Sequence, residues 1–140
     1  MMKNLFSTKI NLKSLDFILL LTRIAVAAFM LTHGYPKLMK LLAGGEIQFA
    51  DPFGLGMIFS LVLVVFAEFF CSILVGFGIG TRLATIPLII TMSVAAFIAH
   101  EADPFGKKEM ALLYLVIYVF LLFTGSGRFS VDYLISRKSK

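Results

Sequence analysis

Residues 56–79 read GMIFSLVLVVFAEFFCSILVGFGI, a mostly apolar run that contains one charged side chain, Glu68. A helix that crosses the hydrocarbon core of a bilayer needs about 20 such residues. Backbone groups in hydrocarbon must find hydrogen bonds within the protein, which a helix provides and an isolated strand does not. This stretch therefore predicts a membrane-spanning helix.

The rest of the chain has a composition that suits several helices of this kind. Of 140 residues, 59% are apolar and 15% are charged, and the mean hydropathy is +0.95. Soluble domains carry about 45–50% apolar and about 25% charged residues. The composition excludes an ordinary soluble enzyme, a disordered chain and a disulfide scaffold, and it indicates a surface that contacts lipid. The single cysteine, Cys71, excludes an internal disulfide or a CxxC redox pair.

Three more apolar segments complete the predicted fold, an all-α integral membrane four-helix bundle. The first segment has the basic start of a signal peptide, but Arg23 interrupts it, so we expect this helix to be retained. The expected organisation is an N-tail at 1–14, spans at about 15–32, 56–79, 83–99 and 109–124, and a basic C-tail at 125–140.

The basic side chains predict how these helices are oriented. With four spans, eight Lys and Arg residues fall on the side of the two tails and the Arg82 turn, against four on the other side. Cytoplasmic segments carry the excess of Lys and Arg. We therefore expect both termini in the cytoplasm. Because the bases lie at segment ends, lipid head groups are the expected partner and nucleic acid is not.

The tetrapeptide Asp-Pro-Phe-Gly occurs twice, at 51–54 and 103–106, each time before an even-numbered span. Each of those spans ends in a Gly-X-Gly turn closed by an arginine, at 78–82 and 125–128. Two interpretations remain open: two repeated helical hairpins, or common turn chemistry that recurs by chance. In both, we expect the motif to form a turn. The connection that holds the first copy is also expected to contain a short interfacial helix at 36–42.

Arg23 and Glu68 are the strongest candidates for function, because each lies inside an apolar span where an isolated charge is costly. At 1.5 Å per residue their depths differ by about 4–5 Å, so we expect an ion pair, with Ser72 on the same face of the second helix. Three interpretations remain open. In the first, the pair fixes the register of the two helices. In the second, it is the polar base of a ligand or quinone pocket, or part of a proton relay. In the third, Arg23 extends alone to the lipid head groups.

Tyr114 and Tyr118 lie one turn apart on the fourth span. They either line a pocket for a quinone or another aromatic ligand, with hydroxyls that reach the Arg23–Glu68 pair, or serve as buried packing residues. Cys71 is expected to be a small packing residue. With no nucleotide-binding glycine motif and no haem-attachment motif in the sequence, a quinone is the one cofactor retained as a candidate.

A second candidate site is the outer mouth of the bundle, where histidines and carboxylates would gather if the hairpins pack side by side. These side chains are His33, Asp51, His100, Glu101, Asp103 and Glu109. Histidine and carboxylate can bind zinc or iron, but the spacing matches no metal motif, so we expect solvated loop residues and no metal. Glu109 is also expected in the first turn of its helix, where the helix dipole favours a carboxylate.

Taken in order, these motifs resemble the DoxX family of small bacterial membrane proteins. The resemblance covers about 19–132 and rests on Arg23, His33-Gly34, Lys37, Ala67-Glu68, GTRLA at 80–84, EMALLY at 109–114 and GSGRFSVD at 125–132. It implies a four-helix integral protein of the bacterial inner membrane. The family takes its name from a subunit of an archaeal thiosulfate:quinone oxidoreductase, and other members resemble membrane partners in redox-stress complexes.

The resemblance implies a membrane subunit of a redox or oxidative-stress complex that faces the quinone pool and works with a soluble redox partner protein. The chain differs from some members after Glu68, where Phe69-Phe70-Cys71-Ser72 replaces a glycine-rich stretch. It has no redox cofactor motif of its own, so an autonomous oxidoreductase is not expected. The alternatives are a small transporter or channel that uses the buried carboxylate, and a non-catalytic membrane scaffold; a homo-oligomer is compatible with each.

Overall fold

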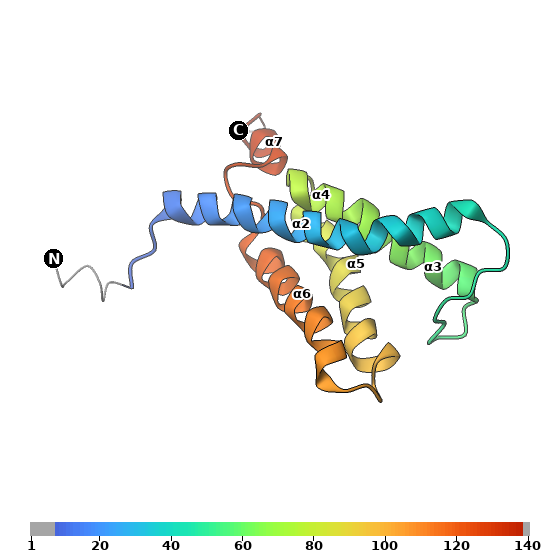
Figure 1. Ribbon diagram of the computed structural model, residues 1–140. Helices are drawn as coiled ribbons and strands as arrows, with labels where there is room; N and C mark the ends of the chain where they lie inside the picture. The colour runs from blue at the N-terminus through green and yellow to red at the C-terminus, as the bar shows by residue number, and fades with distance from the viewer. Residues whose placement is uncertain (1–7, 139–140) are drawn as a thin grey trace.

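A computed structural model describes residues 8–138, and within this range every regular element is a helix (Figure 1). Residues 1–7 of the expected N-tail and 139–140 of the expected C-tail lie outside the described residues. The elements are α2 (Leu12–Ala43), α3 (Met57–Val65), η1 (Phe66–Cys71), α4 (Ser72–Phe77), α5 (Thr81–Val94), η2 (Ala95–Ala99), α6 (Phe105–Thr124) and α7 (Val131–Lys138). The segments η1 and η2 are π-helical, so α3–η1–α4 and α5–η2 form two continuous rods.

Within the described residues, three continuous helices are long and apolar enough to cross a membrane. We call them the first, second and third rod: Leu12–Ala43, Met57–Phe77 and Thr81–Ala99. Many of their large apolar side chains are exposed, as expected of a surface that contacts lipid. The predicted all-helical membrane fold is therefore confirmed. Helix α6 has 20 residues, but Lys107, Lys108 and Glu109 lie near its start, which shortens its uncharged part. Its role as a fourth span stays a prediction.

Helix α2 is longer than the first span expected from the sequence. The Asn11 side chain caps its start by accepting hydrogen bonds from the amides of Lys13 (3.0 Å) and Ser14 (3.5 Å). The helix then continues through Pro36 to Ala43. The expected break before a separate interfacial helix at 36–42 is therefore wrong. A proline inside a helix costs one backbone hydrogen bond, and contacts of this part of α2 with the second rod, described below, offset that loss.

The helices pack as two pairs. The buried face of α2 packs against the rod α3–η1–α4, and its residues recur at helical spacing: Leu19, Arg23, Val26, Ala27, Met30 and Gly34. Helix α5 lies along α6, and it also contacts η1 and α4 (Figure 1). Helix α6 touches α2 only slightly. The second rod and α5 therefore form the centre of the molecule and join the two pairs.

The two Asp-Pro-Phe-Gly copies take different conformations. In the first copy the Gly54 amide donates to the Asp51 carbonyl (3.3 Å), and Gly54 has a φ of +66° that closes a turn. In the second copy Phe105 and Gly106 are the first residues of α6. The expected turn is therefore wrong for the second copy. The reason is local: the good helix formers Lys-Lys-Glu-Met-Ala follow it, whereas Leu-Gly follows the first copy.

Residues after α6 close one end of the bundle, which we call the glycine-turn end. The Asp132 carboxylate accepts hydrogen bonds from the amides of Gly80 (2.6 Å) and Thr81 (3.0 Å) at the start of α5. The Asp132 amide donates to the Gly78 carbonyl (2.9 Å). Burial acts to raise the pKa of Asp132, but the hydrogen bonds from Thr81 and Gly80 outweigh it and leave the pKa below its ordinary value. A residue from the expected C-tail thus caps a distant helix.

Replacing this cap should destabilise the fold. We expect Asp132→Ala to lower the free energy of unfolding by about 1 kcal/mol, the usual cost of losing an N-cap, as measured by unfolding in detergent micelles. Because the folded pKa is depressed, the contribution of Asp132 is present above about pH 4 and is lost as the pH falls through the folded pKa. Glu46→Ala, at an exposed carboxylate in the α2–α3 connection, is the control. Equal stabilities of the two variants would contradict the cap.

Candidate functional site

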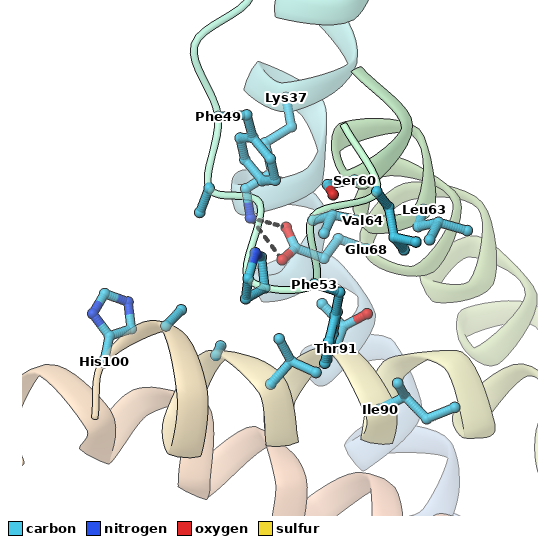
Figure 2. A pocket seen from close by; sticks show the side chains of 16 residues that line it. Lys37, Phe49, Phe53, Ser60, Leu63, Val64, Glu68, Ile90, Thr91 and His100 are labelled. Carbon is cyan, nitrogen blue, oxygen red and sulfur yellow. Dashed lines mark hydrogen bonds and ion pairs between the residues drawn. The ribbon is translucent and has the colours of Figure 1, made fainter. Parts of the chain in front are cut away.

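Glu68 is paired with Lys37. The Lys37 ammonium nitrogen lies 2.6 Å and 2.5 Å from the two carboxylate oxygens of Glu68 (Figure 2). The Glu68 side chain is 5% exposed and that of Lys37 is 30% exposed. Removing one partner of a buried ion pair is strongly destabilising because it leaves the other charge uncompensated. Lys37 therefore offsets the free-energy cost of burying the carboxylate, and it holds the last third of α2 against the rod Met57–Phe77.

Arg23 is buried, as expected, but it binds backbone carbonyls at the glycine-turn end. Its guanidinium donates to the carbonyls of Val75 (3.5 Å) and Gly76 (3.4 Å), and also to that of Phe129. The carbonyls in the last turn of a helix have no partner within it, and a cation is favoured there. The expected Arg23–Glu68 ion pair is therefore wrong, because Arg23 meets carbonyls at the end of α4 and Glu68 meets Lys37.

The backbone around Glu68 is unusual. Glu68 lies in the π-helical segment η1, and such short π segments inside α-helices are frequent at functional sites. On α2, Gly34 lies against this segment: a Cβ added to Gly34 would be 2.7 Å from the Glu68 carbonyl carbon. Glycine therefore permits the close approach of α2 that brings Lys37 to the carboxylate.

A cavity of about 340 Å³ opens beside the Lys37–Glu68 pair (Figure 2). Its walls come from α3, η1, the α5–η2 rod and the α2–α3 connection. Most of its lining is apolar, including Phe49, Phe53, Leu63, Val64, Ile90 and Val94, and the polar lining residues are Lys37, Ser60, Glu68, Thr91 and His100. Apolar walls with a few placed polar groups are typical of small-molecule sites, whose volumes run from about 300 to 1,000 Å³.

His100 stands at the edge of the cavity, on the rod opposite the ion pair (Figure 2). Its Nδ1 lies 2.7 Å from Oδ2 of Asp103, and the Lys107 ammonium lies 3.3 Å from Oδ1 of the same carboxylate. The hydrogen bond with His100, and after it the one from Lys107, hold the pKa of Asp103 below its ordinary value. Two of the residues expected at the outer mouth are thus brought together.

Asp51, another residue expected at the mouth, has a local structural role. Its carboxylate accepts hydrogen bonds from the amides of Gly56 (2.8 Å) and Leu55 (2.9 Å) and from the Ser60 hydroxyl (2.9 Å). The bond from Gly56 is the largest cause that lowers the pKa of Asp51, against a smaller opposing effect of desolvation. These bonds close the connection in front of α3 and hold the cavity wall in place.

The remaining residues expected at the mouth do not join the dyad of His100 and Asp103. The His33 ring packs edge-on against Tyr114, with ring centroids 6.0 Å apart. Glu101 and Glu109 are exposed. Because α6 begins at Phe105, Glu109 lies beyond its first turn, so the expected dipole role is wrong. In the range 8–138, no group of three or more His, Cys, Asp or Glu side chains is placed to hold a metal ion.

The tyrosines of α6 are core residues in the structure. Tyr114 and Tyr118 stack with ring centroids 6.1 Å apart, and Tyr118 is fully buried. Ser72 and Cys71 are also buried. Of the residues expected to form one polar centre, the structure places Glu68 at the cavity, whereas Arg23, Ser72, Tyr114 and Tyr118 do not line it.

Lys37, Phe49 and Phe53 line the cavity but are not among the residues expected at a site. The signal for Lys37 is its spacing: it follows Arg23 by about four helical turns, so the two share a face once α2 continues past Pro36. The two phenylalanines lie in an irregular connection and have no periodic signal.

Comparison with known proteins agrees with these features. The DoxX family model matches residues 18–101, a range that holds Arg23, Lys37, Glu68 and His100. This chain belongs to the DoxX family. It is similar to a protein of Haemophilus influenzae, with 29% identity over 126 residues that cover 83% of this chain and 89% of the relative. It is also similar to the "Putative oxidoreductase CatD" of Bacillus subtilis, with 28% identity over 129 residues, 91% of this chain and 94% of that protein. No solved structure matches.

The close approach at Gly34 can be tested with two glycine substitutions. We expect Gly34→Ala to lower the unfolding free energy by about 1–3 kcal/mol, the usual cost of overpacking, because the added Cβ meets backbone atoms of η1. Gly106→Ala is the matched control, since a Cβ there meets open space. Thermal unfolding in lipid nanodiscs measures both. A Gly34→Ala protein as stable as Gly106→Ala would show that α2 and η1 are not in contact.

Proposed function

We propose that this chain is a four-span protein of the bacterial inner membrane and the membrane subunit of a redox or oxidative-stress complex. In this proposal it binds a quinone in the cavity beside Lys37 and Glu68. The cavity carries the proposal: it has about 340 Å³, mostly apolar walls, an ion pair on one side and His100 on the other. A quinone head group has the matching chemistry, an apolar ring with two carbonyl oxygens that accept hydrogen bonds.

The ion pair suits a neutral ligand with an acceptor oxygen. A lysine ammonium has three N–H donors, and the two carboxylate oxygens of Glu68 take up two of those of Lys37. The third donor is left for a ligand carbonyl. Since the pair is neutral overall, it adds no net charge to a cavity that an apolar molecule must enter.

One relative supports a redox role. The similar protein of Bacillus subtilis carries the name "Putative oxidoreductase CatD", and the similarity extends over nearly the whole of both chains. Reduction of a quinone to a quinol takes up two electrons and two protons. The proposal therefore includes a soluble redox partner protein that exchanges electrons with the bound quinone.

A small transporter or channel is the second candidate, favoured by the buried carboxylate in a spanning helix. Such carboxylates mark ion and proton pathways, and Glu68 is 5% exposed. In this case Glu68→Gln should abolish pH-coupled flux into liposomes. If neither the wild type nor the variant carries flux, and the wild type retains quinone in the experiment described next, the redox proposal is favoured over a transporter and over a non-catalytic scaffold.

Quinone binding should depend on the Lys37–Glu68 pair. We expect native-lipid preparations of the wild type to retain quinone, measured by extraction and mass spectrometry. The double variant Lys37→Met/Glu68→Gln should retain about tenfold less, because the ligand loses a charged hydrogen-bond donor. The double change leaves no buried charge unpaired, so folding is less affected than by either single change.

Lys40→Met provides the matched control for that experiment. Lys40 lies one turn further along α2, is exposed, and donates to the Gln48 carbonyl outside the cavity. This variant should retain quinone as the wild type does. Wild-type protein without quinone, or equal losses in both variants, would contradict the proposal.

The number of spans and their orientation give a separate prediction. In a Cys71→Ser background, a cysteine at Gln48 should react with a membrane-impermeant maleimide on intact spheroplasts, because the α2–α3 connection is proposed to face outward. A cysteine at Ser136 in α7 should react only after lysis. Labelling of both positions from the same side would exclude the proposed topology.

A further inference from the structure

The turn that carries His100 is fixed by its backbone. The His100 amide donates to the Ala95 carbonyl (3.1 Å) and ends η2, and the Asp103 amide donates back to the His100 carbonyl (3.1 Å). The same turn holds Nδ1 of His100 2.7 Å from the Asp103 carboxylate. With Nδ1 bound to a carboxylate, Nε2 is the ring nitrogen left for a ligand.

His100 lies at the cavity, and both His100 and Asp103 are partly exposed. Their side chains are 43% and 31% exposed, and His100 is also one of the residues that line the cavity (Figure 2). The Glu68 carboxylate, in contrast, is 5% exposed. The two polar points of the cavity therefore differ: the Glu68 carboxylate is enclosed, and His100 is partly exposed.

Charged groups surround His100. Asp103 is the carboxylate in direct contact, and Lys107 binds the other oxygen of that carboxylate. Across the cavity, Lys37 and Glu68 offset each other, and the Lys108 ammonium is bonded to the Glu101 carbonyl. Histidine is the side chain whose ordinary titration falls between pH 5 and 8, so it can exchange a proton under physiological conditions.

We infer that His100, held by Asp103, is the proton-exchanging group of this cavity, and that binding of quinone is coupled to uptake of a proton from the aqueous surface. The inference rests on the proposed function, because it concerns the same cavity. With Asp103 at Nδ1, the neutral ring carries its proton there and Nε2 is an acceptor. A quinone carbonyl also accepts, so it can bind Nε2 only after the ring has gained a second proton.

A quinol has the opposite requirement. Its hydroxyl donates to Nε2 of the neutral ring, and no proton is taken up. Binding itself moves no electron in either case; one proton passes from water to His100 when quinone binds and returns when quinone leaves. The oxidised and reduced ligands therefore have opposite pH dependences, and His100 sets both.

Calorimetric titration of the full-length protein in nanodiscs tests this inference, with decylubiquinone and its quinol as probes. Titrations in buffers of different ionisation enthalpy count the protons taken up. Above the titration of the ring, wild-type protein should take up close to one proton per quinone, and affinity should fall about tenfold per pH unit because only protonated His100 binds it. Quinol should bind without proton uptake in the same range.

Three variants identify the group involved. His100→Gln should abolish the proton uptake and flatten both pH profiles. Asp103→Asn should retain binding but reduce the proton uptake, because an amide no longer holds the ring proton at Nδ1 and the neutral ring can then donate from Nε2. Glu101→Gln is the matched control, an exposed carboxylate two residues from Asp103, and it should behave as the wild type.

The outcomes separate this inference from the proposed function. Quinone binding by the wild type without proton uptake overturns the role of His100 and leaves the quinone site in place. Unchanged proton uptake in His100→Gln assigns the proton to another group and likewise overturns it. A wild type that binds neither quinone nor quinol overturns both.

Discussion

The structure of the half of the molecule that contains the cavity depends on the Lys37–Glu68 ion pair. A carboxylate enclosed by apolar helices needs a cation within hydrogen-bonding distance, and Lys37 reaches it only because α2 remains helical past Pro36. That continuation in turn needs Gly34, where any larger residue would meet the backbone of η1. The connection that follows α2 then folds back over the pair and places Phe49 in the cavity wall.

Charge is distributed differently at the glycine-turn end. There Arg23 binds the carbonyls at the end of α4, and Asp132 binds the amides at the start of α5. Each side chain has the sign that the helix dipole favours at its position. Residues far apart in the sequence are thus joined at the tight turn between two central helices, and the segment after α6 becomes part of the fold rather than a free tail.

The sequence predicts the helices and the burial of Arg23 and Glu68 well, because apolar runs and the cost of an isolated charge are local properties. It fails for the partners of these charges. The depth comparison of Arg23 with Glu68 counted residues from the cytoplasmic ends of the expected spans, and it ignored the backbone groups that a helix end exposes. The expected end of the first span near 32 also left Lys37 outside that helix, whereas α2 continues past it. The cavity could not be predicted at all, since Phe49 and Phe53 reach it through an irregular connection with no periodic pattern.

The length of α2 has a consequence for where the cavity lies. A helix of 32 residues is about 48 Å long, whereas the hydrocarbon core of a bilayer is about 30 Å thick. Even a strongly tilted α2 extends beyond that core, and Lys37 lies in its last third. Its partner Glu68 lies near the middle of the rod Met57–Phe77. The ion pair therefore joins the centre of one helix to the final part of another, and the cavity beside it runs from that centre to the α2–α3 connection.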